Sequence, residues 1–309
     1  MQTVLPQTVF PTGDQWTIQH RDHEAVIVEV GGGLRSYRAG ARDLLHGYPD
    51  TAKADAGRGQ VLMPWPNRIR DGNYVFAGKD QQLALTEPAR SNASHGLVRW
   101  ANWTAVRHDS DALLVEYVLR PQPGWDWTLR LQIAYTLSGD GLMVTPSATN
   151  LSDTASPFGY GAHPYLTAGE AVVDDVSLSV PASRMLTVDQ RLIPIGSAQV
   201  DATAYDFRGG AVIGSTQLDH CYTGLAAKHG RWSVLVETDD SRTTLWADAT
   251  RFPYAQVFTG DSLPGERARH TGIAVEPMTC PSNAFNSGDG LITLAPGETW
   301  TGTWGITPT

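Results

Sequence analysis

Short apolar runs separated by turn residues recur along the whole chain, and this pattern predicts a β protein. Within the runs apolar and polar residues tend to alternate, Gly, Pro, Asn and Asp lie between them, and no long stretch keeps a helical period. The expected strands are Trp16–Arg21, Glu24–Val30, Leu34–Ala39, Asn73–Phe76, Gln81–Thr86, Leu113–Arg120, Thr128–Leu137, Leu142–Asn150, Phe158–His163, Trp232–Glu237, Thr243–Ala247, Ala255–Thr259, Gly272–Glu276, Gly290–Leu294 and Thr299–Gly305. So many strands require a large sandwich or barrel-like architecture.

The 309 residues show no boundary that would divide them. Gly and Pro are spread evenly, and there is no low-complexity tract, charge block or repeat. We therefore expect one domain over residues 1–309, large enough for a substantial core.

Charge and cysteine usage narrow the class of partner. A formal charge of −9 argues against nucleic acid or an anionic membrane as partner, since both require a basic surface. The two cysteines, Cys221 and Cys280, make no disulfide framework and favour a reducing compartment. The N-terminus lacks the features of a signal peptide, and no apolar run is long enough to span a bilayer. We expect a cytoplasmic protein.

One candidate catalytic residue is Glu276, in the stretch from Gly272 to Gly288. Alternation places Ala274 and Glu276 on one face of the expected strand, and the small alanine leaves room for a ligand. Because Pro277 cannot continue a ladder, we expect the strand to stop at Glu276 and leave it at the mouth of a loop. An ordinary solvated glutamate is the alternative.

Two loops before the middle of the chain carry polar residues suited to binding. Met63–Arg70 contains two prolines, which stiffen a loop that presents Asn67 and Arg68. Ser91–Gly96 presents His95 just before a glycine. Each set of side chains could instead be ordinary surface residues.

A histidine beside two glycines is the most informative of the polar positions. Strand alternation puts Gly159, Gly161, His163 and Tyr165 on one face, so the imidazole stands beside two positions without side chains. An empty platform next to a histidine indicates a ligand site.

A further carboxylate, Asp219, precedes an aromatic-containing strand and is followed by His220. Spacing does not decide which of the two would contact a ligand. No metal-ligand pattern is present, and His20 and His23 are expected to be surface residues. A nucleophilic role for Cys221 or Cys280 is a minor alternative, since buried thiols are usually inert.

These stretches, taken in order, resemble the aldose 1-epimerase (galactose mutarotase) family. The resemblance covers nearly the whole chain and consists of Asn67-Arg68-Ile69, His95-Gly96, His163-Pro164-Tyr165, Leu218-Asp219-His220 and Glu276 in Glu-Pro-Met-Thr-Cys-Pro. Where the best-known members usually carry His-Ser-Tyr-Phe-Asn-Leu, this chain has His163-Pro164-Tyr165-Leu166, and the glutamine-containing run after the glutamate is absent. These departures put the identity of the sugar in doubt more than the chemistry.

The resemblance implies a β-supersandwich whose active site lies on the concave face of a large antiparallel sheet. It implies Glu276 as general base and His163 as general acid, with Arg68, His95, Asp219 and Asn67 in substrate binding. The implied reaction interconverts the anomers of a free aldose, without metal or other cofactor, in a monomer or homodimer. A carboxylate beside His163 would favour the protonated imidazole that an acid requires.

Three rival functions stay open. A glycoside hydrolase would pair Glu276 with Asp219, and a sugar-binding module on the same fold would catalyse nothing. A hexose-6-phosphate 1-epimerase would need converging cations, for which the candidates beside Arg68 are Arg70, Lys79 and Arg99. The sequence favours a neutral sugar, because these cations are few and because tryptophans suited to stacking on a pyranose flank the same loops: Trp65, Trp100 and Trp103.

Overall fold

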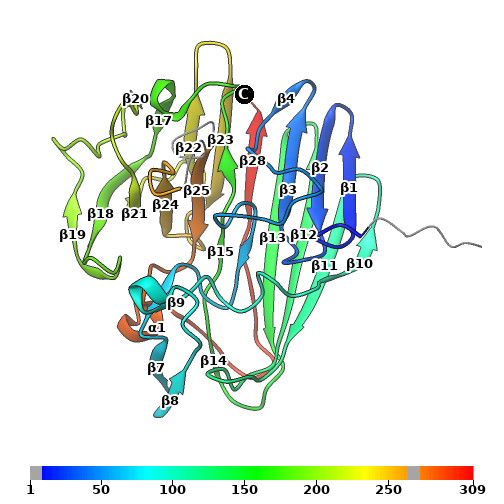
Figure 1. Ribbon diagram of the computed structural model, residues 1–309, viewed down its shortest axis with the longest axis vertical. Helices are drawn as coiled ribbons and strands as arrows, with labels where there is room; N and C mark the ends of the chain where they lie inside the picture. The colour runs from blue at the N-terminus through cyan, green and yellow to red at the C-terminus, as the bar shows by residue number, and fades with distance from the viewer. Residues whose placement is uncertain (1–8, 264–271, 309) are drawn as a thin grey trace, which may run out of the picture.

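The computed structural model describes residues 9–263 and 272–308, and most of its regular structure is β-strand (Figure 1). The strands pair antiparallel in the large ladders. The expected all-β fold with large antiparallel sheets is confirmed. None of the helices in the described ranges is long and apolar enough to cross a membrane. Residues 1–8 lie outside these ranges, so the expectation that no signal peptide is present stays a prediction.

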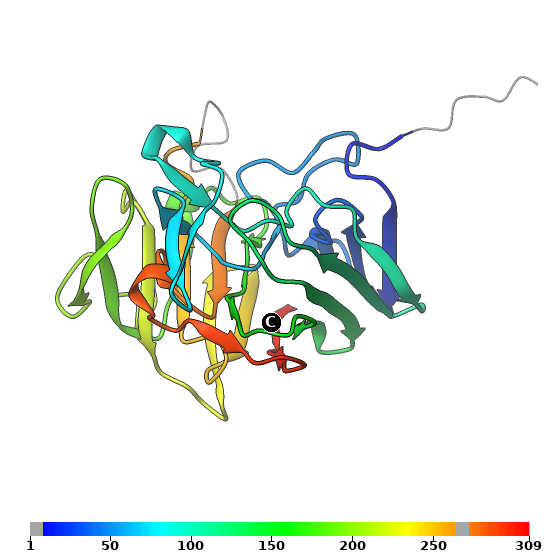
Figure 2. The same ribbon diagram turned by 90° about the horizontal axis from the view of Figure 1, so that it is seen from below.

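The larger sheet has ten strands. In spatial order its main path is β10 (Thr104–His108), β11 (Ala112–Leu119), β12 (Leu129–Ser138), β13 (Gly141–Asn150), β28 (Trp304–Pro308), β23 (Arg242–Asp248), β22 (Arg231–Glu237), β17 (Ser177–Ser179) and β20 (Ala211–Val212), and β27 (Thr299–Thr301) also pairs with β13. A four-stranded sheet packs against its β11 and β12 (Figures 1 and 2). Its strands are β1 (Gln15–His20), β2 (His23–Val28), β3 (Leu34–Ala39) and β4 (Arg42–Asp43).

The second large sheet has eight strands and carries the polar residues of interest. Its order is β19 (Pro194–Gln199), β18 (Ala182–Val188), β21 (Asp219–Leu225), β24 (Tyr254–Phe258), β25 (Ile273–Met278), β15 (Gly161–Ala162) and β5 (Val61–Leu62), with β16 (Tyr165–Leu166) also on β25. Several of these strands escaped the sequence pattern because they are short or only partly apolar.

Small elements complete the fold. They are the pairs β6 (Arg68–Arg70) with β9 (Asn92–Ser94), β7 (Asn73–Phe76) with β8 (Lys79–Gln82), and β14 (Ser156–Phe158) with β26 (Ile292–Leu294), the 3₁₀ turns η1 (Pro88–Arg90) and η2 (Val173–Asp175), and the short helix α1 (Ala284–Ser287). The β6–β9 pair joins the two predicted binding loops, because Arg68 lies opposite Ser94 in its ladder.

Alternation explains why the long strands form and where they pack. In β12, Leu129, Leu131, Ile133, Tyr135 and Leu137 are all buried, while the residues between them are partly or fully exposed. Burying each such side chain contributes about 1.5–3 kcal/mol. The buried residues of the large sheets and of the four-stranded sheet belong to one hydrophobic cluster.

The strand that carries Glu276 does not stop there, so that expectation is wrong. β25 runs on through Pro277 to Met278, and Pro277 lies opposite Ala255 of β24. On the other side of β25, Val275 and Thr279 donate their backbone N–H groups to Pro164 and Tyr160. The nitrogen of Pro277 therefore faces the interruption between β15 and β16, where the ladder requires no donor. Glu276 is consequently an interior strand residue.

Three other expectations are corrected. The predicted strand Phe158–His163 is broken, since β14 ends at Phe158 and β15 begins at Gly161. The glycines form no empty platform: a Cβ at Gly159 would lie 2.6 Å from the sulfur of Cys280, and one at Gly161 would lie 2.7 Å from Pro66. His23 is buried and lies 2.8 Å from the hydroxyl of Tyr37, because β2 turns it into the core.

Candidate functional site

The residues selected from the sequence gather in one pocket of about 490 Å³, within the usual range for small-molecule sites. Among its lining residues are Asn67, Arg68, His95, His163, Asp219 and Glu276. They come from β6, β21 and β25 and from residues just outside β6, β9 and β15. All six candidates are thus brought together, although the first and the last, Asn67 and Glu276, are more than two hundred residues apart in the chain.

His163 and Glu276 form a buried pair at the bottom of this pocket. The imidazole Nε2 lies 3.3 Å from a carboxylate oxygen of Glu276, and the two side chains are 7% and 3% exposed. His163 stacks on the ring of Tyr165, with centroids 5.2 Å apart, and a Cβ at Gly57 would lie 2.6 Å from its Cδ2. The imidazole therefore packs against both the Tyr165 ring and the backbone of Gly57.

Burial controls the protonation of this pair. Burial raises the pKa of Glu276 well above its usual value, the charge of Asp219 adds to this, and Arg68 opposes it. Burial likewise lowers the pKa of His163 to about 3, and the charges of Arg99, Arg58 and Arg68 add to the lowering. Both shifts favour the uncharged forms, a protonated Glu276 carboxyl and a neutral His163 imidazole, over the ion pair. The neighbouring carboxylate was expected to favour a protonated His163, whereas burial shifts the pKa of the imidazole in the opposite direction.

A second histidine is fixed as a hydrogen-bond donor. The Nδ1 of His95 accepts the backbone N–H of Asn67 at 3.2 Å, and the backbone N–H of His95 is donated to the Asn67 carbonyl at 2.7 Å. Burial lowers the pKa of His95 well below its usual value, so its ring is neutral. With Nδ1 accepting, the ring proton is on Nε2, where it is available to a ligand oxygen.

Arg68 is anchored by a residue that sequence reasoning missed, Glu87. Its Nε and Nη2 donate to the two Glu87 oxygens at 2.7 and 3.0 Å, and its Nη1 donates to the side chain of Asn67 at 2.9 Å. Burial alone would raise the pKa of Glu87, but its hydrogen bonds with Arg68, Asn92 and Arg90 lower it. The pairing leaves one N–H on each terminal nitrogen of Arg68 for a ligand.

On the opposite side of the pocket, Asp219 is oriented by Gln256, which sequence reasoning also missed. Gln256 donates its amide N–H to Asp219 at 2.6 Å and lies directly across from Glu276 in the β24–β25 ladder. His220 packs against Tyr205 with tilted rings whose centroids are 4.4 Å apart, and it does not line the pocket. Of the two residues that spacing left open, the structure thus turns Asp219 toward the site. A polar Gln256 inside the apolar strand Ala255–Thr259 was the available signal.

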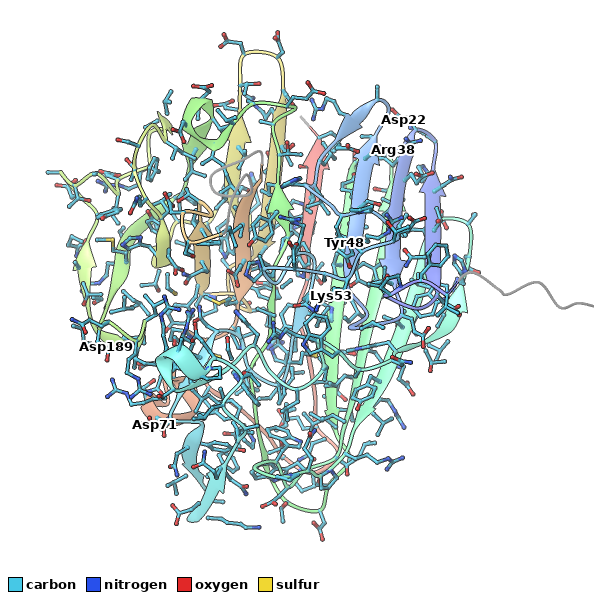
Figure 3. All side chains as sticks on the ribbon, in the orientation of Figure 1. Asp22, Arg38, Tyr48, Lys53, Asp71 and Asp189 are labelled. Atoms are coloured by element: carbon cyan, nitrogen blue, oxygen red, sulfur yellow. The ribbon has the colours of Figure 1, made fainter. Side chains whose placement is uncertain are left out.

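The cations proposed for a phosphate clamp are mostly elsewhere. Arg70 pairs with Asp189 at 2.9 Å, and Lys79 pairs with Asp126, and neither lines the pocket. Figure 3 shows Asp189 in the lower left of the molecule, away from Lys53 near its middle. Arg99 does line the pocket, as do the unanticipated Lys53 and Arg90.

Burial also decides which of the suggested tryptophans and cysteines can take part in the site. Trp65 and Trp103 belong to the hydrophobic core, whereas Trp100 is 55% exposed and lines the pocket. Cys221 and Cys280 are buried, and burial raises the pKa of both thiols, that of Cys280 to about 12. A thiolate nucleophile is therefore disfavoured at either position.

The geometry agrees with comparison against known proteins. The family model described as aldose 1-epimerase matches residues 14–307. The chain belongs to the aldose 1-epimerase family. Across 288 residues it is 31% identical to the uncharacterized Escherichia coli K12 protein YihR, covering 93% of this chain and 91% of YihR.

Solved structures share the fold of this epimerase-family chain. A GalM/aldose epimerase homologue from C. elegans superimposes with a TM-score of 0.85 at 18% identity, covering 96% of this chain and 98% of that one. Galactose 1-epimerase from Lactobacillus acidophilus NCFM gives a TM-score of 0.79 at 22% identity, covering 95% and 93%. Both the family and the galactose mutarotase-like fold implied by the sequence are thereby confirmed.

Proposed function

We propose that this protein is an aldose 1-epimerase that interconverts the α and β anomers of a free aldose. The observation that carries the proposal is the buried His163–Glu276 pair, 3.3 Å apart, beneath a pocket lined by hydrogen-bonding groups. An acid and a base held in contact with one substrate meet the chemical requirement of this reaction. Membership of the epimerase family supports the same assignment.

The reaction needs one proton removed and one supplied. Glu276 takes the proton of the C1 hydroxyl while His163 gives a proton to the ring oxygen, and the bond between C1 and the ring oxygen breaks. The resulting aldehyde rotates about the bond from C1 to C2, and the ring closes from the other face with both proton transfers reversed. No oxidant, reductant or group acceptor enters this balance.

The single proton of the pair supplies the required starting state. Burial favours that proton on Glu276, and the 3.3 Å contact allows it to pass to the Nε2 of His163. This transfer creates an ionised base and a protonated acid. A sugar hydroxyl that donates to the Glu276 carboxylate stabilises this state, since the carboxylate then has a second hydrogen-bond donor.

The remaining polar groups hold the sugar. Arg68 and the Nε2 of His95 donate hydrogen bonds, Asp219 accepts them, and Asn67 acts through its contacts to both Arg68 and His95. Glu87 orients Arg68, and Gln256 orients Asp219. Binding a sugar therefore costs little additional side-chain entropy at these two residues.

Polarimetry of freshly dissolved anomers tests the proposal. The wild-type protein should speed the approach to equilibrium of at least one aldose in a panel of hexoses, pentoses and acidic sugars, and Glu276→Gln should not. Glu237→Gln is the matched control, since Glu237 pairs with Arg242 on a distant strand. Binding of sugars without any acceleration would instead identify a sugar-binding module, and release of nitrophenol from nitrophenyl glycosides would identify a hydrolase.

A further inference from the structure

Three residues that line the pocket have no part in the proton transfers described above. They are Lys53, Arg99 and Trp100, which we call the cationic wall. The guanidinium carbon of Arg99 lies 5.9 Å from the centre of a Trp100 ring, and the indole is 55% exposed. A large exposed aromatic ring at the edge of a polar pocket is suited to stacking on a sugar face.

Most ionised groups of the pocket are already paired with one another. Arg68 and Arg90 share the carboxylate of Glu87, and Asp55 lies 3.1 Å from Arg58. Asp219 receives the amide of Gln256. These anions are therefore engaged by other groups.

The two cations of this wall differ from the rest. Across residues 9–263 and 272–308, neither Lys53 nor Arg99 has a carboxylate within 4.0 Å. The contacts of Arg99 are to neutral groups, the Gln60 side-chain oxygen at 3.3 Å and the Ser94 carbonyl at 3.4 Å. Partial burial also lowers the pKa of Arg99. A partly buried cation without a counter-ion is costly unless a ligand supplies the anion.

Arg99 lines the same pocket as the reacting groups and influences the pKa of His163. Burial is the main cause of the lowered pKa of both His95 and His163, and the charge of Arg99 adds to the lowering for each. Arg99 is thus close enough to affect the imidazoles electrostatically, and all three residues line the one pocket.

We propose that the substrate is an aldose with a singly charged acidic group at the end remote from C1, bound by Arg99 with help from Lys53 while Trp100 stacks on the sugar ring. This inference rests on the proposed function. One desolvated guanidinium matches one negative charge, whereas exposed Lys53 adds only a screened attraction. A phosphate dianion generally requires more converging cations than one partly buried guanidinium. The sequence-based preference for a neutral sugar is revised accordingly, because two of the three tryptophans behind it are core residues.

A matched set of sugars tests the charge. The kcat/KM for mutarotation is measured for glucose, glucuronate, glucose 6-sulfate and glucose 6-phosphate. The sulfate and phosphate esters have nearly the same shape and differ in charge at neutral pH. We expect kcat/KM for glucuronate or glucose 6-sulfate to exceed kcat/KM for glucose at least tenfold. This difference should shrink as the salt concentration rises from about 20 to about 300 mM.

Variants assign the preference to the cationic wall. Arg99→Gln should reduce the ratio of kcat/KM for the sulfate to that for glucose about tenfold, and Trp100→Ala should raise KM for all four sugars. Arg70→Gln is the matched control, because Arg70 is ion-paired with Asp189 outside the pocket, and it should leave the ratio unchanged.

The outcomes separate this inference from the proposed function. If glucose is turned over as well as the acidic sugars, or Arg99→Gln leaves the ratio intact, the inference is overturned and the epimerase proposal stands. A preference for phosphate over sulfate would overturn the single-charge assignment. If no sugar is turned over, the proposed function fails, and calorimetric titration with glucose 6-sulfate decides the inference: binding weakened tenfold or more by Arg99→Gln supports it, and the absence of binding overturns it.

Discussion

At the scale of single residues, the buried pair of His163 and Glu276 couples stability to chemistry. A carboxyl group this deep is costly to ionise, which raises its pKa, and the same desolvation lowers that of the imidazole. The site therefore keeps an acid and a base in contact with neither permanently charged. This arrangement suits a reaction in which the two groups exchange roles when the ring closes.

Removing either member of the pair should abolish most of the activity. We expect Glu276→Gln and His163→Asn each to lower kcat about 10²–10⁴-fold, the usual contribution of a positioned acid or base. Circular dichroism should show an intact fold, since both replacements keep the approximate side-chain shape. Wild-type turnover in Glu276→Gln would place the base elsewhere.

Glu276→Gln should also change how stability depends on pH. Because the pKa of Glu276 is raised in the folded protein, the stability associated with this group is complete below the unfolded pKa of about 4.5 and is lost as pH rises toward the folded pKa. Glutamine has no such loss. Thermal unfolding should therefore show a higher Tm for Glu276→Gln than for wild type at about pH 8, with a difference that shrinks toward about pH 4. A difference independent of pH would contradict the raised pKa.

Arg68 and Asp219 should behave as binding residues. Replacing either by Ala should raise KM several-fold as well as lower kcat, because both contact the ground state as well as the transition state. Arg70→Ala is the control for Arg68→Ala, since it lies two residues away in the same strand but pairs with Asp189. Initial rates over a range of sugar concentrations separate the two parameters. An unchanged KM in both Arg68→Ala and Asp219→Ala would remove them from the binding set.

At the scale of elements, a loop and a broken sheet edge together position the histidine. His163 lies between β15 and β16, and the turn at Gly57 crosses its ring closely. The backbone at Gly57 has a φ of +77°, which other residues adopt at a cost. Only a residue without a side chain meets both the conformational and the steric requirement.

Gly57→Ala should therefore damage catalysis beyond its effect on stability. Its Cβ would lie 2.6 Å from His163, whereas Gly78, with a φ of +78°, has open space around it. Both alanine variants should lose about 1–2 kcal/mol of stability from the left-handed backbone. Only Gly57→Ala should lower kcat, as measured by polarimetry well below the Tm of each variant. Equal activities would show that the loop does not position the imidazole.

At the scale of the whole molecule, the proposed chemistry is independent of metal. Within residues 9–263 and 272–308 no group of three or more His, Cys, Asp or Glu side chains is arranged to hold a metal ion. Mutarotation should survive exhaustive dialysis against EDTA, because proton transfer by His163 and Glu276 needs no Lewis acid. A loss of activity restored by a divalent cation would contradict this expectation.

The sequence by itself determined the class of fold and identified six of the residues that line the pocket. Alternation in strands such as Leu129–Ser138 indicates which face is buried, and it can be recognised without knowing which strands lie beside it. The order of Asn67-Arg68, His95, His163, Asp219 and Glu276 was sufficient for the family resemblance. These features are properties of residues and their immediate neighbours in the chain, so they can be recognised in the sequence alone.

Only the tertiary structure decided how these residues are paired and protonated. Glu87 and Gln256 orient Arg68 and Asp219 across long stretches of chain, and Pro277 is tolerated in β25 only because β15 and β16 interrupt the neighbouring ladder. Whether Arg70 or Arg99 enters the pocket depends on which way each side chain leaves its element. Burial, counter-ions and desolvation arise from distant segments in contact, and so the pKa values and the charge of the pocket follow from the fold.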